Sequence, residues 1–151
     1  LKNRADDKDR FDLWAVDTVT GASRMLVDSA ALASSGPLSE AERMNRERKR
    51  IANVKGITDY GWSPDAKSLL VPVDGDIWLA RLDAAPRRLT STPDTETDAQ
   101  LSPKGGFASF VRERALFVTN LATGQETRLA GEADAKISWG VAEFIAQEEL
   151  A

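Results

Sequence analysis

A sequence repeat with a period of about 39 residues constrains the fold of this chain more than any other feature. In each of two copies an apolar residue precedes a Ser-Pro pair, a polar turn and a strand-like run. The copies occupy residues 62–71 and 101–110, and a second pair of strand-like runs keeps the same offset at residues 76–80 and 115–119. Periods of about 40 residues are typical of β-propellers, in which a four-stranded sheet, or blade, recurs around an axis.

Short strands separated by tight turns are expected throughout the chain. An earlier copy of the pattern begins at residues 12–17, turns at Thr20-Gly21 and returns through residues 24–27. Thr123-Gly124 marks an equivalent turn, and glycine accepts the positive φ that such turns need. We therefore predict an all-β fold, a β-propeller fragment of about three blades. Five aromatic residues are predicted to be core: Trp14, Trp78 and Phe117 at equivalent blade positions, and Trp62 and Trp139 between blades.

One insertion of about 25 residues interrupts the repeat between Trp14 and Trp78, and its sequence predicts a helix within residues 38–54 or so. Ser39 followed by Glu42 forms a capping box, and Glu42 and Arg46 are placed to pair one turn apart. The segment is rich in basic residues: Arg43, Arg46, Arg48, Lys49 and Arg50. Because it lacks a broad apolar stripe, we expect this helix to lie on the surface or to project from the blades.

The composition limits the chemistry that this chain can perform. Its 151 residues, 42% hydrophobic and 29% charged, suit about one globular domain. It contains no histidine and no cysteine, so it cannot complete a Ser-His-Asp or Cys-His site, and we expect no catalytic residues, no cofactor and no metal site in it. The acidic run at Asp6, Asp7, Asp9 and Asp12 lacks the glycine and glutamate of an EF-hand and is interpreted as a polar turn. A net charge of -4 gives no electrostatic reason to expect nucleic acid as a partner.

The last residues of the chain carry the strongest candidate binding group. An apolar segment from Trp139 ends in two adjacent carboxylates, Glu148 and Glu149. An ammonium group has three donors, and two carboxylates can accept two of them while balancing its charge. Adjacent helical side chains point about 100° apart, so the pair converges only at a helix end or outside an ideal helix. Taken alone, such a pair is more often a solvated helix face.

With these segments taken together, the whole chain resembles the amino-terminal propeller domain of the dipeptidyl peptidase IV family, in its bacterial branch. The matching residues are Asp12-Leu13-Trp14, Leu26-Val27-Asp28, Arg46-Glu47-Arg48-Lys49-Arg50, Gly56-Ile57-Thr58-Asp59-Tyr60, Trp62-Ser63-Pro64-Asp65 and the run from Ala142 to Glu149. Ser-Pro-Asp turns occur in many propellers. The arginine-rich helix at its distance before Gln147-Glu148-Glu149 is the more specific match.

The resemblance implies that substrate recognition and catalysis belong to different domains of a longer protein. In that family an eight-bladed propeller precedes an α/β-hydrolase domain that carries the catalytic serine, aspartate and histidine, so the chain would be a partial N-terminal propeller with the hydrolase domain downstream. The family removes dipeptides from free amino termini, preferring proline or alanine at the second position. By this resemblance Glu148 and Glu149 bind the substrate ammonium group, and Arg50 binds a substrate carbonyl.

The implied partners are peptides with a free amino terminus and the hydrolase domain of the same protein. The sequence does not decide whether the full-length protein forms a homodimer. It also does not decide whether the protein lies in the periplasm or the cytoplasm of a bacterium. Two other functions are compatible with the pattern. One is a non-catalytic propeller that serves as a scaffold for protein partners. The other is a propeller-capped oligopeptidase or acylaminoacyl peptidase, which has no need for a glutamate pair. Since three blades cannot close a ring, we also expect the chain to fold poorly by itself.

Overall fold

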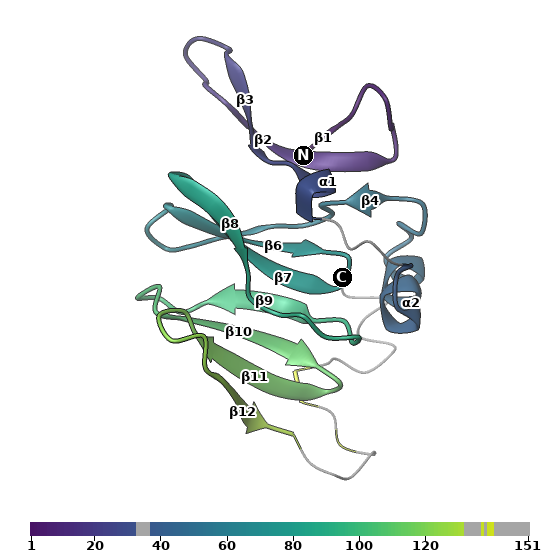
Figure 1. Cartoon of the computed structure of the whole chain (residues 1–151), viewed down its shortest axis with the longest axis vertical. Helices are drawn as coiled ribbons and strands as arrows, with labels where there is room; N and C mark the ends of the chain where they lie inside the picture. The colour runs from purple at the N-terminus through teal and green to yellow at the C-terminus, as the bar shows by residue number, and fades with distance from the viewer. Residues whose placement is uncertain (33–36, 132–136, 138, 141–151) are drawn as a thin grey trace.

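Three four-stranded sheets, stacked one below another, form the body of the chain (Figure 1). The computed structural model describes residues 1–32, 37–131, 137 and 139–140. The first sheet contains β1 (Lys2–Asn3), β2 (Arg10–Val16), β3 (Ser23–Val27) and β4 (Lys55–Gly56). The second contains β5 (Gly61–Trp62), β6 (Ser68–Val73), β7 (Asp76–Arg81) and β8 (Ala84–Arg88). The third contains β9 (Thr97–Leu101), β10 (Phe107–Arg112), β11 (Ala115–Asn120) and β12 (Glu126–Ala130).

The second and third sheets are antiparallel meanders whose strands pair in chain order. The first sheet differs, because β4 returns from the helical insertion and pairs in parallel with β2. The predicted fold, an all-β propeller fragment of about three blades with an inserted helix, is confirmed.

The core lies between the sheets, and β6 contributes to it from both faces. Leu69 and Val71 belong to a cluster shared with the first sheet, whereas Leu70 belongs to a cluster that includes Ala108 of the third sheet. Successive side chains of a strand point to opposite faces, so a strand between two neighbouring sheets buries both sets. The stack therefore excludes water from β6 on both sides.

The Ser-Pro turns confirm the predicted repeat at atomic detail. The hydroxyl of Ser63 accepts a hydrogen bond from the Ser68 N–H at 2.9 Å, and the hydroxyl of Ser102 accepts one from the Phe107 N–H at 3.1 Å. Ala66 and Gly105 occupy the same left-handed position, with φ of 55° and 70°. The two turns thus have one geometry with different side chains.

The aromatic residues at equivalent positions are half-buried, and each lies under a cation. The Lys2 ammonium is 4.7 Å from the centre of the Trp14 ring, and the guanidinium carbons of Arg88 and Arg112 are 5.9 and 4.2 Å from Trp78 and Phe117. These three aromatic residues were predicted to lie in the core, but each is only partly buried.

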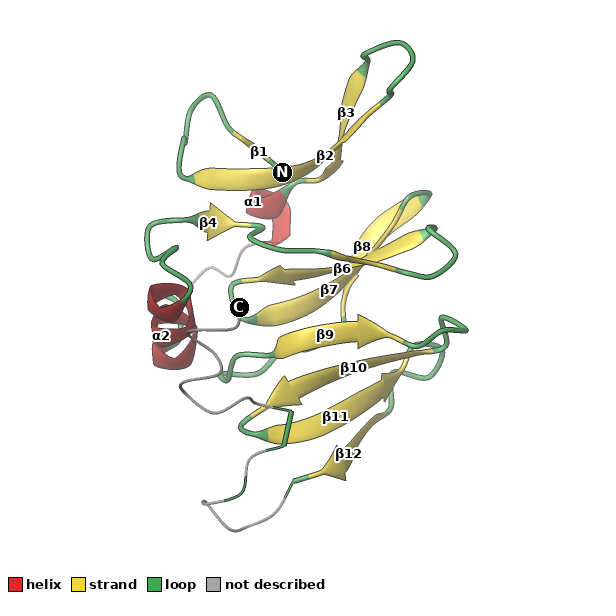
Figure 2. Cartoon of the chain, turned by 180° about the vertical axis from the view of Figure 1, so that it is seen from behind, coloured by secondary structure: helices red, strands yellow, loops and turns green. Residues whose placement is uncertain are grey.

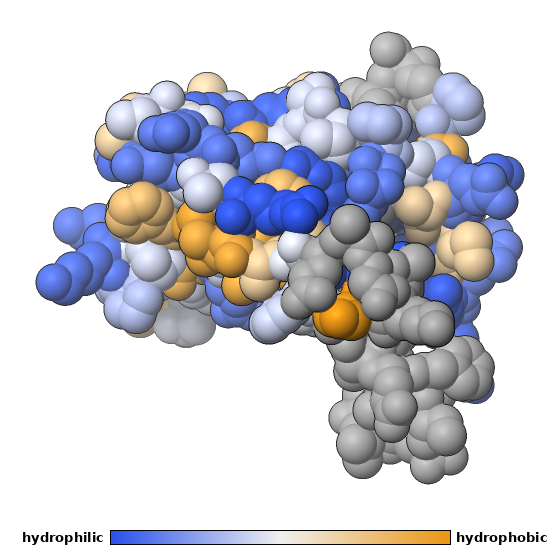
Figure 3. Space-filling model, turned by 90° about the horizontal axis from the view of Figure 1, so that it is seen from below, coloured by the Kyte–Doolittle hydropathy of each residue, from blue (hydrophilic) through white to orange (hydrophobic). Residues whose placement is uncertain are grey.

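Two further tryptophans differ from the prediction that they pack between blades. Trp62 is 50% exposed and Trp139 is 41% exposed. Trp62 lies on the two-residue strand β5, at the edge of the second sheet, and the described residues leave half of it uncovered. Seen from below in Figure 3, the outer side of the stack shows apolar surface among polar side chains. The third sheet has two large exposed apolar side chains, those of Phe107 and Leu129.

The helical insertion forms where the sequence predicts it, but the way it attaches to the sheets was not predicted. Helix α2 (Glu40–Arg48) lies within the predicted residues, after the short helix α1 (Ser29–Leu32). Ser39 caps α2 by accepting the Glu42 N–H at 3.1 Å. The helix lies on the surface, as expected, and most of its residues are exposed, but Glu42 and Arg46 face inward and are 6% and 3% exposed. A charged face, rather than an apolar one, attaches α2 to the sheets.

The acidic run near the amino terminus is also corrected at one residue. Asp12 is not part of a turn: it lies in β2, is 1% exposed, and accepts the Ser29 N–H at 2.8 Å. Burial alone would raise the pKa of Asp12, but the Arg4 guanidinium at 2.8 Å and the Ser29 N–H outweigh burial and hold this pKa below its ordinary value.

Within the described residues, no helix is long and apolar enough to cross a membrane.

Candidate functional site

A cavity of about 300 Å³ lies where α2 meets the second and third sheets. Its walls are formed by α2 with the following Lys49, by residues 56–61, by strand β6 with its turn to β7, and by residues 96–100. Figure 1 shows α2 at one end of the strands, beside β4 and apart from the hairpin turns at the opposite end. The sequence insertion therefore builds the cavity, because it brings a helix against the ends of two blades.

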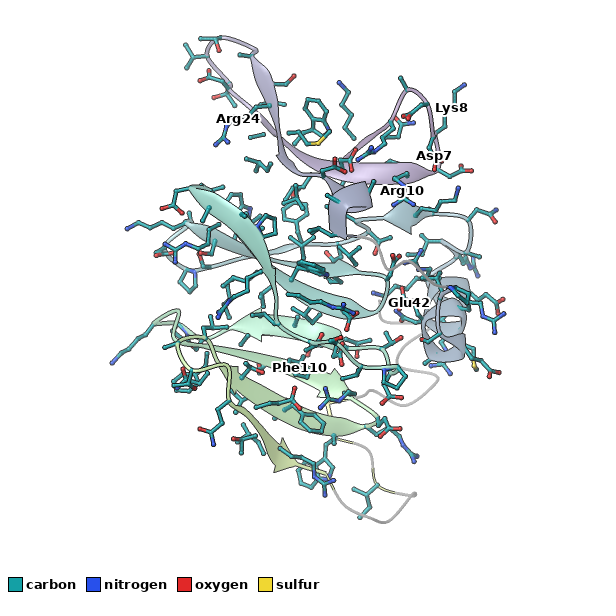
Figure 4. The ribbon with its side chains drawn as sticks, viewed as in Figure 1. Asp7, Lys8, Arg10, Arg24, Glu42 and Phe110 are labelled. Carbon is teal, nitrogen blue, oxygen red and sulfur yellow. The ribbon has the colours of Figure 1, made fainter. Side chains whose placement is uncertain are left out.

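From a buried position, Arg46 connects α2 to two other segments, the loop before β4 and the turn between β6 and β7. Its Nε is 2.7 Å from Oε1 of Glu42, its Nη2 is 3.0 Å from Oδ1 of Asp74, and its Nη1 donates to the Val54 carbonyl at 2.6 Å. Asp74 lies in the turn between β6 and β7 and has a left-handed backbone with φ of 54°. Glu42, labelled in Figure 4, lies on the side of α2 that faces the sheets. The fixed fork of donors on an arginine suits this three-way contact.

The predicted carbonyl-binding residue, Arg50, lies just after α2 and has an exposed side chain. Its backbone is left-handed, with φ of 56°, and its N–H donates to the Glu47 carbonyl at 2.9 Å. Arg50 does not line the cavity, whereas its neighbours Lys49 and Arg46 do. The role of Arg50 stays a prediction.

Sequence reasoning did not single out Arg46 as a residue of the cavity. Its pairing with Glu42 was expected from their spacing, and the ion pair is present. The contact with Asp74 joins residues 28 positions apart in the chain, so no local pattern announces it.

The glutamate pair, Glu148 and Glu149, lies outside the described residues, so its position relative to the cavity stays a prediction. Polar groups of the cavity that are described include Lys49, Asp59, Tyr60, Asp98 and Gln100. They offer donors and acceptors of both charges, as a polar, peptide-like ligand requires. Because the sequence contains no histidine and no cysteine, the cavity has neither an imidazole base nor a thiolate.

A buried carboxylate, Glu96, forms one wall of the cavity just before β9 and links the second sheet to the third. It is 2% exposed and accepts hydrogen bonds from the hydroxyls of Thr90 and Thr92, both at 2.7 Å. The Arg112 guanidinium lies 3.3 Å away. Burial raises the pKa of Glu96 above its ordinary value, the nearby Asp76 carboxylate adds to the rise, and the three hydrogen bonds oppose it without cancelling it.

We expect Glu96→Gln to change the pH dependence of stability. Because the folded-state pKa of Glu96 is raised, its contribution to stability is complete below the ordinary glutamate pKa and is lost as pH rises through the folded-state value. The variant should therefore lose less stability than the parent as pH rises from about 4 to 7. Urea unfolding of the full-length protein across this range measures the difference.

Asp12→Asn is the matched control, because the pKa of Asp12 is shifted in the opposite direction. Its stabilising contribution is present above the ordinary aspartate pKa and is lost as pH falls through the folded-state value. The two variants should thus diverge from the parent protein with opposite pH trends. Parallel curves for the parent protein and Glu96→Gln would contradict the assignment.

Comparison with known families matches the chain to one of them over its carboxyl-terminal part. Residues 83–151 match the family model described as the dipeptidyl peptidase IV (DPP IV) N-terminal region. The matched segment contains strand β8, the whole third sheet and the Glu148-Glu149 pair, and it begins after the helical insertion. The resemblance inferred from the sequence is thereby confirmed at the level of the family, by a match that covers residues 83–151.

Proposed function

We propose that this chain is the substrate-recognition part of a serine-type dipeptidyl aminopeptidase that removes Xaa-Pro or Xaa-Ala dipeptides from free amino termini. The observation that carries the proposal is the family match, because it spans the segment that ends in Glu148 and Glu149. The stacked four-stranded sheets support the proposal, since a propeller domain is built from such sheets.

The proposed role of Glu148 and Glu149 is to hold the ammonium group of the substrate. An enzyme that removes two residues must measure their length from the chain end, and a fixed anchor for the amine does this. A longer amino-terminal extension would collide with the anchor. Each charge-assisted hydrogen bond contributes about 1.5–3 kcal/mol. Two such bonds are enough to separate free from blocked amino termini by about a hundredfold or more.

Catalysis itself belongs, in this proposal, to an α/β-hydrolase domain elsewhere in the same protein. The chain has no histidine, so the base of a Ser-His-Asp triad must come from outside it. A nucleophile elbow in the remainder of the reading frame would supply the serine. The propeller part then provides the amine anchor and an arginine for a substrate carbonyl.

Arg50 is proposed as that arginine, and Arg48 offers a matched control because both side chains are exposed near the end of α2. We expect Arg50→Ala to lower kcat/KM for a dipeptidyl substrate about tenfold, the loss of one charge-assisted hydrogen bond. Arg48→Ala should change it less than twofold. Equal effects of the two substitutions would remove Arg50 from the site.

The test of the proposed function uses the full-length protein and two substrates, glycyl-prolyl-p-nitroanilide and its N-acetylated form. Cleavage of the free-amine substrate, with kcat/KM about a hundredfold or more above that of the blocked one, is the expected result. Equal cleavage of both would indicate an oligopeptidase-like enzyme in which the glutamate pair is incidental. Cleavage of neither would favour the non-catalytic scaffold.

A further inference from the structure

A second cavity, of about 220 Å³, lies between the second and third sheets at the end of the strands opposite α2. In Figure 2 the turns that join β7 to β8, β9 to β10 and β11 to β12 lie at this end, to the right, while α2 lies to the left. We call this cavity the basic groove, because four cationic side chains line it: Lys67, Arg81, Arg87 and Lys104. Only one carboxylate, that of Asp65, lines it with them. This local excess of positive charge contrasts with the net charge of -4 of the whole chain.

The carboxylate of Asp65, which lines the basic groove, is hydrogen-bonded within its own turn. Oδ1 of Asp65 accepts the Ser63 hydroxyl at 2.6 Å and the Lys67 N–H at 3.1 Å. These two hydrogen bonds lower the pKa of Asp65, the Ser63 hydroxyl most. Arg81 pairs with Asp83 at 3.3 Å, but both side chains are exposed at the rim. Solvent screens an exposed pair strongly, so this contact removes little of the groove's positive potential.

Lys104 is the residue that the fold does not explain. It occupies, in the turn between β9 and β10, the position that Asp65 occupies between β5 and β6. The two turns keep the same backbone hydrogen bond. The Ala66 N–H donates to the Ser63 carbonyl at 2.9 Å, and the Gly105 N–H donates to the Ser102 carbonyl at 2.8 Å. Since the turn forms with either residue, the reversal of charge at Lys104 serves something other than turn geometry. Among the described residues, neither Lys104 nor Lys67 has a carboxylate within 4.0 Å, although the Lys67 charge helps to lower the pKa of Asp65.

The walls of the basic groove indicate what kind of anion it fits. Leu79, Leu101 and Leu121 line it between the cations, and Arg87 crosses from β8 to donate to the Leu121 carbonyl at 2.7 Å. Its described lining consists of strands and turns, without the helix N-terminus that commonly binds phosphate. Guanidinium groups match carboxylates, and a leucine surface suits an apolar neighbour of the acid. We infer that the basic groove is a docking surface for an acidic peptide segment in which carboxylate side chains adjoin apolar ones.

The inference is tested on the full-length protein with a peptide that the proposed amine anchor cannot hold. The probe is an acetylated and amidated hexapeptide of alternating glutamate and leucine, and its glutamine counterpart is the control ligand. Isothermal titration calorimetry should show saturable binding of the glutamate peptide, weakening as salt is raised, and at least about fivefold weaker binding of the glutamine peptide.

Lys104→Asp is the decisive variant, because the equivalent turn already folds with aspartate at that position. We expect it to weaken binding of the glutamate peptide about fivefold to tenfold, through loss of one attraction and gain of one repulsion. Arg24→Asp makes the same charge change on an exposed residue of β3 in the first sheet, labelled in Figure 4, and should change the affinity less than twofold.

Three results would overturn the inference. The first is no saturable binding of the glutamate peptide, and the second is equal weakening by Lys104→Asp and Arg24→Asp. The third is displacement of the peptide by millimolar inorganic phosphate at constant ionic strength, which would make the groove a small-anion site instead of a peptide-docking surface. Hydrolysis of glycyl-prolyl-p-nitroanilide, measured in parallel, reports on the proposed function separately, since the blocked peptide is no substrate for it.

Discussion

Replacing Arg46 with methionine is expected to lower the free energy of unfolding by about 3–5 kcal/mol. Arg46 is 3% exposed, and its guanidinium contacts the carboxylates of Glu42 and Asp74. Methionine fills similar space without charge, so the substitution removes the cation that Glu42 and Asp74 share in a poorly solvated place. An uncompensated buried charge costs much more than the net value of an ion pair. The loss should also separate α2 from the turn between β6 and β7.

Arg43→Met is the matched control, because Arg43 lies on the same helix and is exposed. Its effect should stay within about 0.5 kcal/mol, as is usual for surface substitutions. Combining Arg46→Met with Glu42→Gln and Asp74→Asn should recover part of the stability, since the stranded charges are then removed. Urea unfolding of the full-length variants measures all three effects. Similar midpoints for Arg46→Met and Arg43→Met would show that the buried ion pairs do not hold the helix.

Gly56→Ala is expected to destabilise the protein by about 2–5 kcal/mol. Gly56 has φ of 75°, and an added Cβ would lie 2.5 Å from the Ser29 hydroxyl oxygen and 2.6 Å from the Phe11 carbonyl oxygen. Phe11 belongs to β2, which pairs with β4 through Gly56, so the backbone cannot retreat without breaking that pairing. Two costs therefore combine, a left-handed backbone for alanine and a collision with a paired strand.

Gly124→Ala separates these two costs. Gly124 has φ of 74°, but an added Cβ would meet nothing within 4 Å. This variant should lose only about 1–2 kcal/mol, the cost of the left-handed conformation for a residue with a side chain. The difference between the two variants measures the close approach of β4 and β2. Equal losses in thermal or urea unfolding would mean that the first sheet can adjust around Gly56.

The sequence predicts the blades well because their signals are local. A hairpin needs residues that reverse the chain within a few positions, and Thr20-Gly21 supplies them in the first sheet. The repeat of the Ser-Pro turns is local in the same sense, because each serine hydroxyl contacts a residue five positions later. The apolar run of β6 could likewise be recognised, although its burial on both faces depends on two neighbouring sheets.

Attachment of the helical insertion could not be predicted in this way. Apolar periodicity is the signal that normally places a helix against a core, and α2 instead uses Glu42 and Arg46. The partner that makes this burial favourable, Asp74, lies in a turn 28 residues later. Asp12 shows the same limit, since its burial depends on the Ser29 N–H, 17 residues away. Polar contacts between distant segments leave no periodic trace in a sequence.

Only some of the residues near the cavity could be predicted from the sequence. It identified the basic run and its pairing with Glu42, and it assigned the substrate carbonyl to Arg50 by resemblance. The structure adds Arg46 and Lys49 as residues that line the cavity. The role of Glu148 and Glu149 rests on the family match over residues 83–151 and stays a proposal.

The measurement that tests this account most directly is the ratio of kcat/KM for glycyl-prolyl-p-nitroanilide to that for its N-acetylated form, in the full-length protein and in Glu148→Gln and Glu149→Gln. Each substitution should lower kcat/KM for the free-amine substrate about tenfold to a hundredfold and leave the acetylated substrate unaffected, so the ratio should fall by the same factor. Glu113→Gln, an exposed glutamate in the turn between β10 and β11, should leave the ratio unchanged. A ratio that both anchor substitutions leave at the parent value would contradict the amine anchor.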